Sequence, residues 1–409
     1  MMEFRHAQLD NGLNVVAEVN PDAKSLAAGF FVRTGSRDET PEIAGVSHFL
    51  EHMVFKGTPS RSALEVNLAF DGMGANYNAF TSEENTVFYG EVLPEFQADL
   101  LDLLGDILRP SLREEDFDTE KQVILDEIAL YEDQPHFRLY DNMMSHHFKG
   151  HPLGNSILGT PRSITDLQRR QMLEYFDRRY SATNVACCAV GNVDFDALLA
   201  KVGEMCNQWE AYDVDRDTRS YDGSRDRRII ADKKLTRQNI GLMSPAPSAQ
   251  DDRRFAAQLL SSIIGDSTGS RLYYALVDTA IADDAAMHYS TMDHAGGLLT
   301  FVSCSPEQAP EALRITQNVL AEFAGDGTTE AELRAAKNKI ASSATRKGEL
   351  PMGRLTAVGF DWVYRGEYVP LAEQIDALYA VTAEDVAAVA ARADLTHPTL
   401  VALGPREAI

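Results

Sequence analysis

Residues 48–58, HFLEHMVFKGT, set two histidines and a glutamate within five positions, and they decide how the rest of the chain is interpreted. His48 and His52 are four residues apart, so on a helix their rings project from one face and can bind one ion. Glu51 lies three residues after His48, close enough to reach a water bound to that ion. Zinc suits two imidazoles and a carboxylate, with the fourth position left to water whose proton Glu51 would take. The stretch therefore predicts a metal site with its own base; the alternative is a pair of histidines on a helix surface.

The two halves of the chain show strand and helix patterns in the same order. In the first half an Asn11-Gly12 turn predicts a hairpin, and helical periodicity covers 61–71, 93–108, 114–133 and 163–180 before the apolar strand NVACCAVGNV (184–193). Ser163 with Asp166, and Thr382 with Asp385, have the spacing of capping boxes. The second half again runs from strands (227–247) through a helix (251–265) to a closing helix (381–393) and strand (398–404).

This repetition predicts an α+β protein of two duplicated α/β-sandwich-like units, each an antiparallel-rich sheet covered by helices. Residues 213–228, DVDRDTRSYDGSRDRR, are charged and poor in apolar residues, which is typical of a linker. We expect a metal-binding catalytic domain at 1–212, a linker at 213–228 and a domain without the metal motif at 229–409.

The composition argues against some classes of function and location. The chain has 409 residues, 44% of them hydrophobic, and a net charge of −24, which argues against nucleic acid as a partner. The four cysteines show no C-x-x-C spacing, the first residues hold no apolar core of signal-peptide length, and no apolar run is long enough to span a membrane. We therefore expect a cytoplasmic protein without a membrane partner.

Four stretches together resemble the M16 family of zinc metallopeptidases, in its short half-clamshell type. HFLEHMVFKGT is an H-x-x-E-H motif of the inverzincin kind. LDNGLNVV (9–16) is similar to the family's opening hairpin, GANYNAFTSEENTVFY (74–89) to its substrate-side strand, and EKQVILDEIALYEDQP (120–135) to its second metal helix. The resemblance covers the first half in order and the second half more loosely.

The resemblance implies the rest of the metal site. It places the third zinc ligand at Glu127, a choice over Asp126 that spacing alone does not make. Glu120 lies two helical turns earlier on the same face and would support the site as a hydrogen-bond acceptor. One zinc ion per chain is implied, with Glu51 as the catalytic base.

Residues 75–92 mix Tyr, Phe, Thr and Val in strand fashion, so an edge strand here could pair with an extended peptide; an ordinary core strand is the alternative. By resemblance, Asn78 and Ala79 of the N-A-x-T element, completed by Thr81, hold the substrate backbone. Phe55 either lines the pocket after the scissile bond or simply packs in the core.

The second half departs from the family pattern. Many active members carry an Arg and a Tyr that steady the substrate after an S-R-L turn, but here Val277 stands at the arginine position and Tyr289 is the nearest tyrosine. The arginine of this second substrate contact is therefore missing from its expected position.

The function that the resemblance implies is a zinc-dependent endopeptidase. It would hydrolyse peptides or unfolded segments inside a clamshell chamber of four such units, as a homodimer or as a heterodimer with a related chain. A catalytically weak or partner-dependent subunit with a binding or structural role is the non-enzymatic alternative.

Two other motifs offer competing chemistry. GDSTG (265–269) fits the G-x-S-x-G motif, so Ser267 could be the nucleophile of a serine hydrolase. Asp293 and His397 are examples of an acid and a histidine that could complete a triad. The motif requires a strand before the serine, however, and the preceding residues favour a helix. His146, His147 and His151 could form a second metal patch or be loop histidines at the end of a helix.

Overall fold

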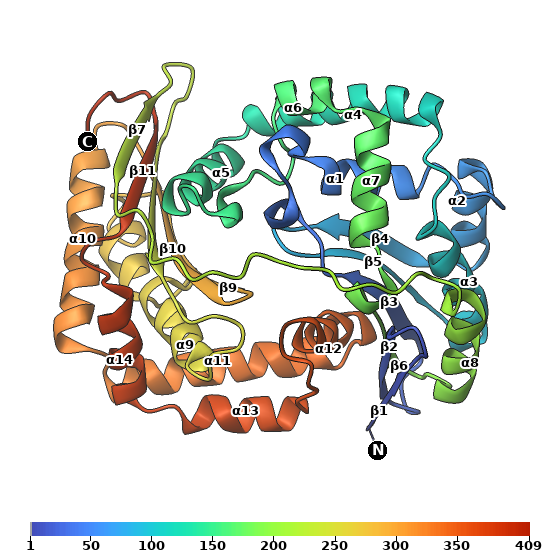
Figure 1. Ribbon diagram of the computed structural model, residues 1–409. Helices are drawn as coiled ribbons and strands as arrows, with labels where there is room; N and C mark the ends of the chain where they lie inside the picture. Colours follow the sequence, from blue (N-terminus) through green and yellow to red (C-terminus); the bar gives the residue numbers. More distant parts are fainter. Residues whose placement is uncertain (1) are drawn as a thin grey trace. The chain divides into compact units, whose positions relative to one another are not determined.

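The computed structural model describes residues 2–409, which form two compact units of mixed helix and sheet (Figure 1). The first unit holds residues up to 129 together with 155–217 and 345–369. The second unit holds 130–154, 218–344 and 370–409. The predicted α+β class with two sheets is confirmed.

The first unit is built on a six-stranded sheet in the order β1-β2-β6-β3-β5-β4. Its strands are β1 (Glu3–Gln8), β2 (Asn14–Val19), β3 (Leu26–Val32), β4 (Asn76–Thr81), β5 (Thr86–Val92) and β6 (Val185–Gly191). The predicted hairpin joins β1 to β2, and Gly12 takes the positive φ of 87° that its turn requires. All pairs are antiparallel except β2 with β6, and β4 lies at one edge of the sheet.

The second unit repeats this topology. Its sheet has the order β7-β11-β8-β10-β9, formed by β7 (Arg227–Ala231), β8 (Gln238–Pro245), β9 (Asp284–Met292), β10 (Ala295–Cys304) and β11 (Thr399–Gly404). As in the first sheet, one parallel pair is followed by three antiparallel pairs. Five strands of each sheet therefore match in order and direction, as a duplicated unit requires.

Helices cover both sheets. The first unit contains α1 (Val46–Val54), α2 (Ala63–Gly72), α3 (Gln97–Ile107), most of α4 (Glu114–Glu132), α6 (Pro161–Asp166), α7 (Arg169–Arg179), α8 (Phe195–Cys206) and α12 (Pro351–Arg365). The second contains α5 (Pro135–His147), α9 (Arg254–Gly265), α10 (Ala309–Asp326), most of α11 (Glu330–Gly348), α13 (Leu371–Ala380) and α14 (Ala383–Ala393). None of the helices described between residues 2 and 409 combines the length and the apolarity that a membrane crossing needs.

Each sequence half gives one helix to the other unit. From the first half, α5 packs on β8 and β11, where Leu139 and Met143 join the core of the second sheet. From the second half, α12 packs on β3 and β6 (Figure 1). The Arg354 guanidinium there forms a buried ion pair with Glu18, which also accepts from the Tyr368 hydroxyl at 2.8 Å.

The compact units therefore differ from the predicted domains 1–212 and 229–409, which are continuous in sequence, because α5 and α12 pack on the sheet of the other half. The predicted linker, 213–228, has neither helix nor strand before β7, and the division between the units falls within it, after residue 217.

The predicted helix over 163–180 is in fact two helices, α6 and α7. Thr160, not Ser163, caps α6: its hydroxyl accepts from the Ser163 N–H at 3.0 Å. Leu167 then takes extended ψ (131°), which ends the helix before α7 begins. By contrast, Thr382 and Asp385 form the predicted capping box at the start of α14.

Candidate metal centre

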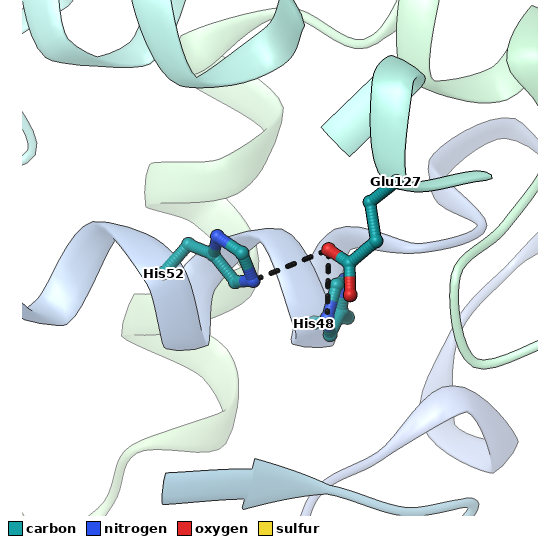
Figure 2. Close-up of side chains that lie close together, drawn as sticks. All are labelled: His48, His52 and Glu127. Atoms are coloured by element: carbon teal, nitrogen blue, oxygen red, sulfur yellow. Dashed lines mark ion pairs between the residues drawn. The ribbon is translucent and has the colours of Figure 1, made fainter. Parts of the chain in front are cut away.

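Helices α1 and α4 bring His48, His52 and Glu127 together (Figure 2). Glu127 Oε2 lies 3.7 Å from His48 Nε2 and 3.5 Å from His52 Nε2, and the three potential ligand atoms are all within 4.8 Å of one another. Zinc–ligand bonds of ~2.0–2.1 Å at tetrahedral angles separate ligand atoms by about 3.4 Å. The three side chains are thus spaced to hold one such ion.

The unsatisfied atoms of the cluster also fit a cation. Glu127 Oε2 is buried and has no hydrogen-bond partner among residues 2–409, an arrangement that is costly unless something else satisfies the oxygen. Burial, together with the neighbouring His52, lowers the pKa of His48 to about 3, so this imidazole is neutral and able to bind a metal. Two imidazole nitrogens and a carboxylate oxygen are a donor set that zinc accepts.

Glu120 stands behind His52. Its Oε1 lies 2.9 Å from His52 Nδ1, so His52 can direct Nε2 toward Glu127. Burial acts to lower the pKa of His52, but the hydrogen bond with Glu120 and the charges of Glu127 and Glu51 outweigh burial and raise this pKa. Since a metal must displace that proton, metal affinity is expected to fall on acidification.

Lys56 also contacts Glu120, and the sequence analysis did not identify this residue. Its ammonium lies 2.5 Å from Glu120 Oε2, while the other oxygen of Glu120 meets His52. Lys56 lies in the turn just after α1, so helical spacing does not place it beside His52.

Glu51 lies on α1 between the two histidines in sequence, and its Oε2 accepts a hydrogen bond from the Thr81 hydroxyl at 2.6 Å. Burial raises the pKa of Glu51; the Thr81 hydrogen bond and the positive charge of His52 oppose this rise without cancelling it. A carboxylate with a raised pKa is better suited to accept and return a proton near neutral pH.

The β4 edge strand packs against α1. Asn78 is exposed and Ala79 is buried, and the Ala79 N–H donates to Asn78 Oδ1 at 2.9 Å. Because β5 pairs with only one side of β4 in the described sheet, the other side is the edge where an extended peptide could add. The role of Asn78 and Ala79 in holding a substrate stays a prediction.

The remaining candidates lie as follows. Phe55 follows α1 and packs near Tyr77 and Phe88, with ring centroids 6.2 Å from each. Tyr289 belongs to β9 of the second unit, where its hydroxyl donates to Pro247 O at 2.7 Å. Val277 ends a short π-helical turn, Tyr273–Val277, in the same unit.

The competing motifs gain no support from their surroundings. Ser267 comes after helix α9, not after a strand, and its hydroxyl donates to the adjacent Asp266 at 3.3 Å. His147 contacts the Thr399 hydroxyl and His151 contacts Arg219 O, both at 3.0 Å. Within residues 2–409, the group arranged to hold a metal is His48, His52 and Glu127.

The buried carboxyl group of Glu39 also fixes where α1 begins. Glu39 accepts from the N–H groups of Gly45 and Ser47 at 2.6 and 2.7 Å, satisfying donors in the first turn of α1. Gly45 has φ of 92°, and a Cβ there would lie 2.5 Å from Leu158 O, so only glycine fits before the helix.

Glu39→Ala is expected to lower the free energy of unfolding by about 1–3 kcal/mol, because two buried N–H groups lose their acceptor. Urea denaturation measures this change. Glu42→Ala, which removes an exposed carboxylate three residues away, is the matched control and should leave the midpoint unchanged. Equal midpoints for both variants would show that Glu39 does not stabilise the start of α1.

Comparison with known proteins gives consistent matches over nearly the whole chain. The family model described as Insulinase (Peptidase family M16) matches residues 14–161, and that described as Peptidase M16 inactive domain matches 166–340. An uncharacterized zinc protease of Mycobacterium tuberculosis is 32% identical over 396 residues, covering 94% of this chain and 90% of the relative. The uncharacterized zinc protease YmxG of Bacillus subtilis is 31% identical over 379 residues, 92% of each. A crystal structure of a protease from Helicobacter pylori superimposes with a TM-score of 0.90 at 20% identity, covering 99% of this chain and 100% of that one.

Proposed function

The chain belongs to peptidase family M16, and we propose that it is a zinc-dependent endopeptidase acting on peptides or unfolded polypeptide segments. The observation that carries the proposal is the convergence of His48, His52 and Glu127, with Glu51 between the two histidines on the same helix. We propose one zinc ion per chain. When bound, zinc would polarise the scissile carbonyl and lower the pKa of the attacking water.

The protein's own residues would move the proton. Glu51 takes it from the attacking water and delivers it to the leaving amine, so one carboxyl group acts first as base and then as acid. Its burial supports this assignment, since a raised pKa brings its proton affinity closer to neutral pH. Glu120, held by Lys56, keeps His52 in the orientation that directs Nε2 to the metal.

The edge of β4 would hold the substrate. An extended peptide adds beside the strand through main-chain hydrogen bonds, which explains how substrates of varied sequence could be accepted. Asn78 and Ala79 would contact the peptide backbone, and Phe55, just after the metal helix, would border the pocket following the scissile bond. Tyr289 remains a proposed substrate contact from the second unit.

We propose that the working form is a dimer. Membership in the family implies a chamber of four α+β units, and this chain supplies two of them. The partner is then a second copy or a related chain. The four cysteines are free and buried, which suits a reducing compartment, and the cytoplasm is the proposed location.

A second candidate is a catalytically weak or partner-dependent M16 subunit. The match of residues 166–340 to the family's inactive domain and the valine at position 277 favour it. The complete set of His48, Glu51, His52 and Glu127 in the first unit favours the peptidase.

Metal analysis of the purified chain, combined with cleavage of an unstructured peptide library, tests the proposal. We expect about one zinc per chain, cleavage that stops when a chelator removes the metal, and recovery when zinc is added. Cleavage that persists after complete zinc removal would contradict the proposal. Zinc binding without cleavage would instead favour the partner-dependent subunit.

A further inference from the structure

A hydroxyl on the edge strand contacts the carboxylate between the two metal-site histidines. Thr81 Oγ1 donates to Glu51 Oε2 across 2.6 Å, a short bond of the kind found when the acceptor is charged. We propose that Thr81 is a positioning residue for Glu51: it fixes the orientation of the carboxyl group that exchanges the proton. The inference rests on the proposed peptidase function and assigns Thr81 a role of its own within it.

Strand geometry explains why Thr81 reaches Glu51. Side chains alternate along β4, so Tyr77, Ala79 and Thr81 share the face opposite to that of Asn76 and Asn78. The first three are buried or half-buried, the other two are exposed, and α1 packs against the strand. Thr81 therefore points toward α1, whereas on the opposite face Asn76 and Asn78 are exposed and Phe80 packs near Phe360 of α12.

The end of β4 is held firmly. Thr81 pairs with Thr86, and the turn between them is closed by the Ser82 N–H donating to Asn85 O at 2.8 Å. Within the turn, Glu84 is buried and forms an ion pair with Arg37 at 2.5 Å, both side chains being at most 2% exposed.

The Tyr364 hydroxyl of α12 also donates to Glu84, at 2.9 Å. Buried charge thus anchors the residues just after Thr81, and a β-branched side chain has few χ1 choices. The position of its hydroxyl is accordingly fixed before any substrate arrives.

A fixed hydroxyl matters because a glutamate has three rotatable bonds. Binding Oε2 selects one orientation of the carboxyl group and leaves Oε1 to exchange the proton. Because Thr81 lies on the strand proposed to hold the peptide, the base and the scissile bond would be positioned by one element. A displacement of about 1 Å between reacting groups can cost a factor on the order of 10² in rate.

Thr81→Val tests the role, because it removes the hydroxyl and keeps the β-branched shape. We expect kcat for peptide hydrolysis to fall about 10- to 100-fold, with KM and zinc content unchanged. Thr81→Ser, which restores a hydroxyl, should return kcat to within about threefold of wild type. Rescue by serine separates hydrogen bonding from packing.

Thr86→Val is the matched control. Thr86 stands directly opposite Thr81 in the same strand pair, and its hydroxyl donates to Thr34 O at 2.9 Å without contact to Glu51. It should lower the denaturation midpoint but not kcat.

An unchanged kcat in Thr81→Val, or an equal loss of kcat in Thr86→Val, would overturn the role of Thr81 while leaving the peptidase function intact. Zinc-loaded wild-type protein that cleaves no peptide would overturn both.

Discussion

Replacing Glu51 with glutamine is expected to lower kcat for peptide hydrolysis by about 10²- to 10⁴-fold, the range typical of losing a general base. Glutamine keeps the size of the side chain, and its carbonyl oxygen can still accept from the Thr81 hydroxyl. It cannot take a proton from water. Since His48, His52 and Glu127 are untouched, zinc content should stay at the wild-type level. Steady-state cleavage of one peptide, measured with metal analysis of the same sample, tests both expectations.

The pH profile provides an independent check on Glu51. A carboxyl group acts as a base only when deprotonated, so the wild-type rate should fall as the pH drops through the pKa of Glu51. Burial raises that pKa above its ordinary value of 4.5, so the fall should begin above this pH. With zinc held at saturating concentration at every pH, so that protonation of His52 does not remove the metal, the residual rate of Glu51→Gln should lack this acidic limb. A variant with full activity, or with an unchanged acidic limb, would remove Glu51 from the role of base.

The local part of the candidate metal site could be predicted from the sequence. Helical periodicity places His48 and His52 on one face of α1, and this depends only on residues within one turn. The distant proposed ligand is different: spacing alone did not separate Glu127 from Asp126, and the choice came from the family resemblance. In the structure Glu127 faces the histidines, while Asp126 is exposed and accepts from Gln122 at 2.8 Å.

Other contacts between segments far apart in sequence were not predicted. Thr81 is 30 residues from Glu51, and nothing in the strand pattern indicates that its hydroxyl would meet that carboxylate. The same limit applies to α5 and α12. Their amphipathic patterns predict helices that cover a sheet, but either sheet would satisfy a local pattern, so the exchange between units appears only when the chain is folded.

The capping-box spacing predicted the start of α14 correctly but the start of α6 wrongly. Thr382 and Asp385 form the predicted box. Ser163 also has an acid three residues later, but Thr160 lies three residues before it and takes the cap, which makes Ser163 the third residue of the helix. The Ser163 hydroxyl donates to Ala44 O at 2.7 Å, a tertiary contact that the sequence does not reveal.

Replacing Glu127 with glutamine is expected to weaken zinc binding by more than about 10²-fold, beyond the 10–100-fold typical of losing an outer partner of a metal ligand. The carboxylate supplies the only negative charge among the three ligands, and its Oε2 lies within 3.7 Å of both histidine Nε2 atoms. Competition against a chelator of known affinity measures the loss directly, without reference to activity.

Two further variants serve as controls for the zinc affinity of Glu127→Gln. Glu120→Gln keeps all three ligands but weakens the contact with His52 Nδ1, so its zinc affinity should fall about 10- to 100-fold, between wild type and Glu127→Gln. Asp126→Asn removes the neighbouring exposed carboxylate and should leave affinity unchanged. The expected order follows from what each carboxylate contacts: Glu127 faces the Nε2 atoms of both histidines, Glu120 contacts only His52 Nδ1, and Asp126 bonds Gln122 instead. Wild-type affinity in Glu127→Gln, or a large loss in Asp126→Asn, would mean that the third ligand is a different residue from the one the geometry places there.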